Sequence, residues 1–439
     1  IRSSFLWLSV TWGSVDPKGS ESLSGIMDGV ALVPVAGLTA WKLQIPSLGV
    51  QVYSGDLLGL SEVLFLDVVL CIPFRFLFGY AAFKVYHSTR PSEAKLQKSE
   101  SSRAWLLPYL YIQELRPLLA MAIGAAFAAH PFVLALLLGT MRSRMAFFIL
   151  AYSGVISTFR WLELAAALGP KGFDADASTF AFYQSMPTEV QFEDGKLKHV
   201  SCRWRRILEL LLSLSIHGAI MLVALSVGRA TEFRPFLEEI PSKLPYFGLP
   251  SSFPALYLQT IWVYCCLTLP MLYHRLLATI LGYETLVSMK APLMLSSSVR
   301  DFWGRRWNLI VHNLMKRCFF VPFQNGGFLK KNLAGFAAFF MSGMFHEYMW
   351  LILHLGRPEG SRYSAGKVLA FFVVQYVLTA IQVILGNMTW LGREGWQLLP
   401  RVLQTVMTTL CILPFGPLFL EGIYDMMNEI DLLPALELL

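Results

Sequence analysis

The chain has 439 residues, of which 55% are hydrophobic and only 15% are charged, and its mean hydropathy is +0.53. Ordinary soluble domains carry about 25% charged residues, so this composition argues against a soluble protein and for an integral membrane protein. The net charge of +7 does not call for a nucleic-acid partner, because basic loops that face anionic headgroups or attract a polyanionic substrate account for it.

The first 56 residues form an N-terminal segment that we expect to be partly membrane-associated. Its apolar stretch at 25–45 is a weak candidate span, interrupted by Pro34. Because the sequence begins with Ile1 and not with methionine, we expect a chain that has been processed or whose start is missing.

The remainder, 57–439, is expected to form one transmembrane domain. A bilayer-spanning helix needs about 20 mostly apolar residues. Runs of this kind lie near 57–80, 116–140, 146–169, 206–227, 255–283, 333–356, 366–386 and 401–421. We therefore predict an all-α polytopic membrane protein, a bundle of about eight or nine transmembrane helices with additional interfacial helices.

Three polar stretches separate the spans. Residues 87–103 and 170–206 are predicted to be exposed loops, because runs of charge are usually solvated. In residues 291–332, charged residues alternate with Trp and Phe without a transmembrane period. Such a mixture is typical of a membrane interface, so we predict an interfacial or re-entrant segment that ends in a turn at residues 324–327.

The span at 333–356 carries two ionisable side chains near its middle, His346 and Glu347. A charged residue at such a depth costs roughly 2.5–3.5 kcal/mol on insertion scales. His346 is therefore either a functional residue or a structural, hydrogen-bonded histidine. Adjacent helical residues point about 100° apart, so Glu347 is expected to meet a polar group on another helix, while Ser342 lies on the face of His346.

The pattern does not favour a metal site. A zinc helix of the HExxH type needs a second histidine at position 350, which is Trp350 here. A neutral, buried histidine can instead act as a general base that removes a proton from a hydroxyl group. No GxSxG motif is present, so a covalent acyl-enzyme is not indicated.

Two motifs together resemble the wax synthase branch of the membrane-bound O-acyltransferase (MBOAT) family. They are SSVRDFWGRRWN at 297–308 and SGMFHE at 342–347. The resemblance implies an MBOAT-like fold, with His346 as the general base and Asn308 positioning the substrates or polarising the acyl carbonyl. It further implies acyl-CoA as a substrate, with no cofactor and no metal.

We expect the substrate-binding residues to be Asp301, Trp303, Arg305, Arg306, Trp307, Ser342 and Glu347. Guanidinium groups bind phosphate, so Arg305 and Arg306 are candidates for CoA contacts; the alternative is an interfacial anchor or an ion pair with Asp301. Trp303 and Trp307 are four residues apart, and a structural role for them competes with direct substrate contact.

The predicted activity is acyl-CoA:alcohol O-acyltransferase, with a fatty alcohol as the first candidate acceptor and diacylglycerol, a sterol or a terpenoid after it. The expected surroundings are membrane lipids, with the endoplasmic reticulum as the expected organelle or else another organelle membrane. Two alternatives stay open: a structural subunit of an oligomer or larger membrane complex, and a proton-coupled transporter that uses His346 and Glu347.

Overall fold

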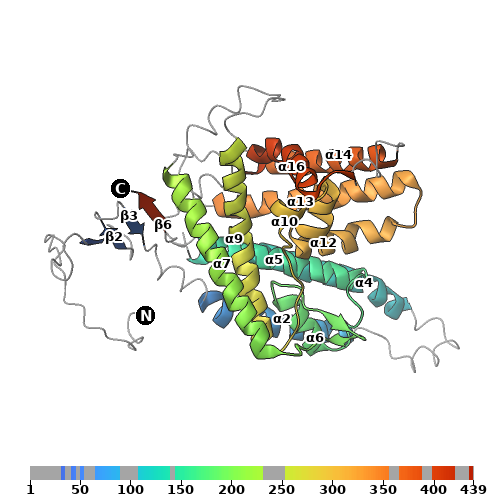
Figure 1. The fold of residues 1–439 in the computed structure, drawn as a ribbon. Helices are drawn as coiled ribbons and strands as arrows, with labels where there is room; N and C mark the ends of the chain where they lie inside the picture. Colours follow the sequence, from blue (N-terminus) through green and yellow to red (C-terminus); the bar gives the residue numbers. More distant parts are fainter. Residues whose placement is uncertain are drawn as a thin grey trace, which may run out of the picture.

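The computed structural model describes residues 31–34, 41–45, 50–53, 65–88, 107–138, 144–230, 253–354, 365–387, 398–420 and 435–438. Most of these residues are helical (Figure 1). The longer helices are α2 (Ile72–Ser88), α4 (Leu107–Leu138), α5 (Arg144–Ala165), α6 (Ala177–Ser185), α7 (Arg203–Ala230), α9 (Phe253–Ile280), α13 (Phe328–His354), α14 (Lys367–Asn387) and α16 (Arg401–Ile412). The π-helical turn η2 (Leu66–Cys71) precedes α2, and the 3-10 turn η8 (Leu413–Phe415) follows α16.

The chain is an integral membrane protein. Six helices in the described part are long and apolar enough to cross a bilayer, and they cover Asp67–Ser88, Arg203–Ala224, Leu256–Ile280, Phe328–His354, Lys367–Leu385 and Arg401–Leu420. Their outward side chains include exposed Leu77, Leu212 and Val377, as expected for helices whose solvent is lipid. Helices α4 and α5 coincide with two further predicted spans, 116–140 and 146–169.

The helices pack in pairs around two apolar cores. Helix α7 lies along α9, α4 along α5, α2 along α6 and α13 along α14 (Figure 1). The larger core joins α5, α9, α13 and α14 through side chains such as Trp262, Ile352 and Phe372. The smaller core joins α2, α4, α5 and α6 around Trp161 and Phe180.

The prediction of an exposed connector at 170–206 is wrong for its middle part. Residues 180–190 are buried, apart from half-buried Phe182. The cause is Arg160, whose guanidinium donates hydrogen bonds to the backbone carbonyls of Tyr183, Met186 and Thr188. These contacts anchor α6 against α5. The short strands β4 (Phe192–Glu193) and β5 (Lys196–Leu197) follow as an antiparallel pair.

The weak candidate span at 25–45 is also wrong. Its described residues form two strands, β1 (Ala31–Pro34) and β2 (Trp41–Ile45), and not a helix. They belong to an antiparallel sheet of order β1-β2-β3-β6, which is completed by β3 (Val50–Tyr53) and β6 (Ala435–Leu438). The backbone of this stretch is hydrogen-bonded by antiparallel pairing, β1 with β2 and β2 with β3, and not within a helix. The loop predicted at 87–103 lies almost entirely outside the described residues.

The segment 291–332 is a succession of short helical pieces. In chain order these are α10 (Pro292–Leu295), α11 (Val299–Asp301), η5 (Phe302–Arg306), α12 (Leu309–Met315), η6 (Lys316–Phe320) and η7 (Val321–Phe323). The turn predicted at 324–327 is confirmed before α13 begins. Its place at the membrane surface stays a prediction.

Buried ion pairs tie this segment to the bundle. Arg317 of η6 donates to Glu163 of α5 at 2.5 Å and to Glu189 at 2.8 Å, and the pKa of Arg317 is raised: burial opposes the charge, but Tyr183 and the two carboxylates outweigh it. Breaking one partner of such a pair leaves a buried charge uncompensated. The pairs therefore fix η6 against α5.

Candidate functional site

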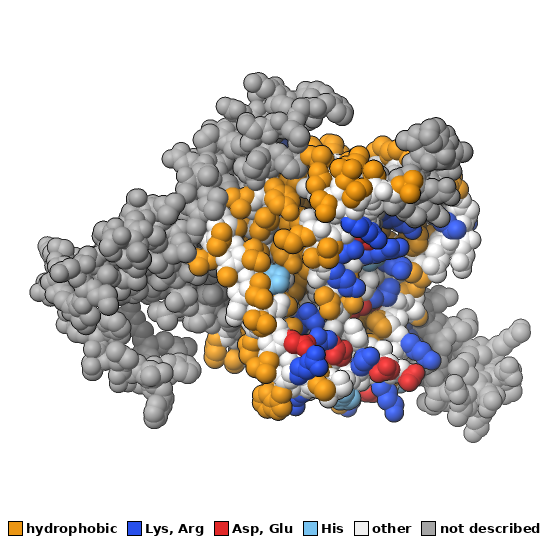
Figure 2. Space-filling model, viewed as in Figure 1, with side chains coloured by type: hydrophobic (Ala, Val, Ile, Leu, Met, Phe, Trp, Pro, Cys, Tyr) orange, Lys and Arg blue, Asp and Glu red, His pale blue; other side chains and the backbone are white. Residues whose placement is uncertain are grey.

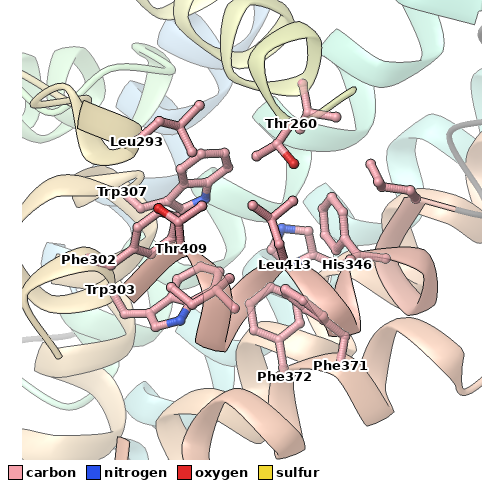
Figure 3. A pocket seen from close by; sticks show the side chains of 15 residues that line it. Thr260, Leu293, Phe302, Trp303, Trp307, His346, Phe371, Phe372, Thr409 and Leu413 are labelled. Carbon is pink, nitrogen blue, oxygen red and sulfur yellow. The ribbon is translucent and has the colours of Figure 1, made fainter. Parts of the chain in front are cut away.

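A small cavity lies inside the bundle where α9, α13, α14 and the end of α16 meet the segment 291–307 (Figure 3). Its volume is about 60 Å³, and its lining is dominated by apolar and aromatic side chains. The residues that line it are Thr260, Val263, Leu293, Phe302, Trp303, Trp307, His346, Phe371, Phe372, Thr409, Ile412, Leu413, Gly416, Phe419 and Leu420. His346 is the one ionisable residue among them.

The hydrogen bonding of His346 defines its tautomer. Its Nδ1 lies 2.6 Å from the backbone carbonyl oxygen of Ser342, one turn earlier in α13. A carbonyl oxygen can only accept a hydrogen bond, so Nδ1 carries the proton. In a neutral imidazole the other nitrogen, Nε2, then has a free lone pair. This lone pair is the chemical feature that a general base needs.

Three phenylalanine rings enclose the imidazole. Phe372 of α14 stacks on it, with ring centroids 4.5 Å apart and an interplanar angle of 29°. Phe345 and Phe419 meet it edge-on at 5.0 Å and 5.4 Å. The rings fix the orientation of the imidazole and keep charged groups away from it.

The two tryptophans predicted to bind substrate both line the cavity. The π-helical turn η5 carries Trp303, and Trp307 follows directly after it. Their rings meet at 6.2 Å, and Trp307 also stacks on Phe302 at 5.2 Å. The indole nitrogen of Trp303 donates to Oε1 of Gln375 at 3.1 Å. Trp303 is thus tied to α14, and both indole rings form part of the cavity wall.

Asn308 does not share this cavity with His346. Its backbone is left-handed, with φ 39° and ψ 63°, and it caps the N-terminus of α12, where its Oδ1 accepts from the Val311 amide at 3.4 Å. The backbone N–H of Asn308 donates a hydrogen bond to Met289 Sδ at 3.1 Å. The side chain is buried but faces the first turn of α12, so the structure does not bring it together with His346 at the cavity.

Asp301, Arg305 and Arg306 also lie apart from the cavity wall. Arg306 Nε donates to Asp301 Oδ2 at 2.6 Å, which is the ion pair that the sequence left as an alternative to a phosphate contact. Burial favours a raised pKa for Asp301, but the hydrogen bond from Arg306 and that from the Ser297 amide outweigh burial and lower the pKa. The side chain of Arg305 is exposed.

Glu347 and Ser342 support the helices around His346. Glu347 Oε1 accepts from the backbone amides of Gly366 and Leu369, at 3.0 Å and 2.9 Å. The carboxylate therefore holds the N-terminus of α14, where helices leave amides unpaired and attract negative charge. Ser342 is buried and contributes its carbonyl oxygen to His346.

Sequence patterns did not reveal the remaining wall residues. Thr260 and Val263 come from α9, Leu413 comes from η8, and Phe419 follows η8. They are ordinary apolar or hydroxyl residues within predicted spans, and no motif separates them from lipid-facing neighbours. Only the tertiary packing identifies them.

Comparisons with known proteins match a segment that contributes part of this site. Residues 287–374 match the membrane bound O-acyl transferase family, and this stretch contains both tryptophans, Asn308, His346 and Phe372. The chain is 30% identical to the probable long-chain-alcohol O-fatty-acyltransferase 3 of Arabidopsis thaliana over 30% of this chain and 39% of that protein. It is 26% identical to the long-chain-alcohol O-fatty-acyltransferase of Simmondsia chinensis over 52% of this chain and 61% of that protein.

A third relative has a different acceptor in its name. The chain is 31% identical to the acyl-CoA–sterol O-acyltransferase 1 of Arabidopsis thaliana over 26% of this chain and 32% of that protein. The matched part of the chain thus spans between 32% and 61% of the length of these three curated relatives.

Proposed function

Because the chain is a wax synthase-like member of the membrane bound O-acyl transferase family, we propose that it transfers an acyl group from acyl-CoA to the hydroxyl group of a lipophilic alcohol. The observation that carries the proposal is the hydrogen bond from His346 Nδ1 to the Ser342 carbonyl. It leaves the basic Nε2 of a residue that lines an apolar cavity available to take a proton.

The proposed reaction is a direct transfer. The hydroxyl oxygen of the acceptor attacks the carbonyl carbon of the thioester while its proton passes to His346 Nε2. The carbonyl oxygen carries negative charge in the tetrahedral intermediate, and the C–S bond then breaks. The thiolate of CoA takes the proton from His346, so that the products are an ester and free CoA. Because a thiolate is a good leaving group, we propose that one base and one oxyanion donor carry out this step; preorganised donors stabilise the charge that develops on the carbonyl oxygen.

The cavity is suited to the reacting groups and not to whole substrates. Its volume of about 60 Å³ is well below the roughly 300–1,000 Å³ of typical small-molecule sites. In our proposal the thioester carbonyl and the hydroxyl meet in this space, while the acyl chain and the acceptor chain extend between apolar helices. Binding then requires wall side chains such as Leu413 to move.

The basic residues after Asp301 support a CoA-binding role at the edge of the site. Figure 2 shows Lys and Arg side chains gathered on the face that lies over α12. The side chain of Arg305 is exposed, and Arg306 is held by Asp301 and by the Lys290 carbonyl. We propose that Arg305 contacts the phosphates of CoA, because guanidinium groups bind phosphate by two parallel hydrogen bonds.

The preferred acceptor in this proposal is a long-chain alcohol, with a sterol second, as the names of the relatives suggest. The proposed location is the membrane of the endoplasmic reticulum, which a fluorescent fusion with organelle markers tests. The activity is tested with purified protein in detergent or liposomes, labelled acyl-CoA and a panel of fatty alcohols, sterols and diacylglycerol, followed by mass spectrometry. Ester formation is expected, and its absence for every acceptor would favour a structural role in a membrane complex.

A further inference from the structure

The hydrogen-bonding groups of the cavity wall are almost all satisfied by the protein. Thr260 Oγ1 donates to the Leu256 carbonyl at 2.7 Å, and Thr409 Oγ1 donates to the Thr405 carbonyl at 2.9 Å. Trp303 Nε1 donates to Gln375 at 3.1 Å, and His346 Nδ1 donates to Ser342. The side-chain protons of these four residues are therefore not available to a substrate.

Trp307 is different. Its ring lines the same cavity as His346 (Figure 3), and within the described part of the chain its indole N–H makes no hydrogen bond. Three other indole nitrogens without a partner, those of Trp161, Trp262 and Trp350, are fully enclosed by protein. Trp307 instead belongs to the wall of a space that a ligand can enter.

Three contacts hold Trp307 in place. Its ring stacks on Phe302, with centroids 5.2 Å apart and planes 17° apart, and it meets Trp303 edge-on. Its backbone amide closes the π-helical turn by donating to the Phe302 carbonyl at 2.9 Å. A donor that is held in place before the substrate arrives needs no reorganisation during the reaction, which is the property of an effective oxyanion site.

We infer that the indole N–H of Trp307 is the donor to the carbonyl oxygen of the acyl group, and that Asn308 is a positioning residue that acts through the backbone of α12. The inference rests on the proposed acyl transfer. As the acceptor oxygen bonds to the carbonyl carbon, the π electron pair of the C=O bond moves onto oxygen, which accepts the hydrogen bond from Trp307 Nε1. The pair returns to re-form C=O when the C–S bond breaks, and His346 passes the proton that it took from the acceptor hydroxyl to the departing thiolate of CoA.

The first test is Trp307→Phe, which removes the N–H and keeps an aromatic ring for stacking on Phe302. Loss of one oxyanion donor is expected to lower kcat about a hundredfold with little change in KM for acyl-CoA. The matched control is Trp161→Phe, which removes a partnerless indole N–H from the smaller core, away from the cavity, and is expected to keep kcat. An unchanged kcat in Trp307→Phe would overturn the inference.

A second variant separates the N–H from the shape of the ring. Replacing Trp307 by benzothienylalanine, introduced by suppression of a stop codon, exchanges the N–H for sulfur at nearly constant volume. Its kcat is expected to fall as in Trp307→Phe. Recovery of the wild-type kcat would show that ring shape alone matters and would contradict the inference.

Binding measurements distinguish this inference from the proposed function itself. The binding of two acyl-CoA analogues is measured by isothermal titration calorimetry. One is a ketone, in which CH₂ replaces the thioester sulfur, and the other is a thioether, which lacks the carbonyl. Trp307→Phe is expected to weaken the ketone about fivefold, in the range of one hydrogen bond, and to leave the thioether unchanged. Equal effects on both analogues overturn the role of Trp307 while acyl transfer stands. Failure of the wild-type protein to bind either analogue or to form any ester overturns both.

Discussion

His346 and Glu347 are neighbours in the sequence, but their side chains serve different helices. The imidazole of His346 turns back along its own helix, with Nδ1 2.6 Å from the Ser342 carbonyl, and its ring stacks on Phe372. The carboxylate of Glu347 leaves α13 and accepts two amide hydrogen bonds at the start of α14. One residue of the pair thus faces the cavity, and the other joins the two helices that form its wall.

Replacing His346 by Ala is expected to lower the rate of ester formation about 10²–10⁴-fold, the usual contribution of a general base. The matched control is His354→Ala. His354 lies two turns further along α13, and its Nδ1 makes the same contact with a carbonyl four residues earlier, that of Trp350, at 2.7 Å. Initial rates with labelled acyl-CoA are compared at equal amounts of folded protein. Full turnover in His346→Ala would contradict the proposed mechanism.

Substitutions of Asn308 distinguish a role of its left-handed backbone from a role of its side-chain amide in the reaction. Its φ of 39° costs roughly 1–2 kcal/mol for an ordinary L-residue, and the lost N-cap costs about 1 kcal/mol more. Asn308→Ala is therefore expected to lower both thermal stability and activity. Asn308→Gly adopts the same backbone without strain and is expected to keep most of both. An equal loss of activity in the two variants, with the stability of Asn308→Gly intact, would assign the amide group to the chemistry.

Gly343 is expected to be sensitive to a single added methyl group. A Cβ there would lie 2.7 Å from Leu369 Cδ1, 3.1 Å from Leu369 Cα and 3.3 Å from Phe372 Cβ, so α13 and α14 would have to separate. We expect Gly343→Ala to cost about 1–3 kcal/mol of stability, as overpacking usually does, and to reduce activity through Phe372. Gly335→Ala is the control at the same helix pair, since its Cβ would meet Tyr376 at an ordinary 3.4 Å. Melting temperatures of the two variants decide the question.

Glu347→Gln and Glu347→Ala test the contact with α14. Glutamine retains an oxygen that can accept from the Gly366 and Leu369 amides, whereas alanine leaves both without this partner. We expect the Ala variant to lose about 1 kcal/mol, the usual value of a helix cap, and the Gln variant to lose less. A proton relay would instead make Gln as damaging to activity as Ala, and assays of both variants at a temperature where both are folded separate the two cases.

Asp301 gives the protein a pH-dependent contribution to stability. Its pKa is lowered because the hydrogen bonds from Arg306 and the Ser297 amide outweigh the opposing effect of burial. The contribution is therefore present above the unfolded pKa of about 3.9 and is lost as the pH falls through the lower folded value. Asp301→Asn should be less stable than the wild type at pH 7, and the gap should narrow below about pH 4. The exposed Asp174→Asn serves as control in thermal unfolding from pH 3 to 7.

Hydropathy and two motifs were sufficient to predict the membrane class, the helical fold and the candidate histidine. Spans can be predicted because a bilayer demands long apolar helices, and His346 stood out because an ionisable residue is costly at that depth. The divergence of His346 and Glu347 followed from helix periodicity alone. These predictions depend on local sequence and on the membrane as solvent.

The features that the sequence did not show depend on contacts between distant segments. Burial of residues 180–190 needs Arg160 of α5, whose carbonyl partners carry no side-chain signal. The left-handed backbone of Asn308 and the π-helical turn before it decide that Trp307, and not Asn308, reaches the cavity. At 25–45, hydropathy predicted a span because it takes no account of strand pairing, in which β2 pairs with β1 and with β3.

The small apolar cavity also bears on a competing reaction. A thioester in a chamber with a general base is exposed to hydrolysis, since water is a smaller nucleophile than any alcohol. The phenylalanine rings around His346 offer water no strong hydrogen-bond partner, and a water molecule is held only where two to four polar groups surround it. An acceptor with a long chain, by contrast, enters from lipid and gains by burying that chain. The wall would therefore act as a kinetic filter that favours ester synthesis over futile loss of acyl-CoA, measurable as the ratio of ester to free fatty acid.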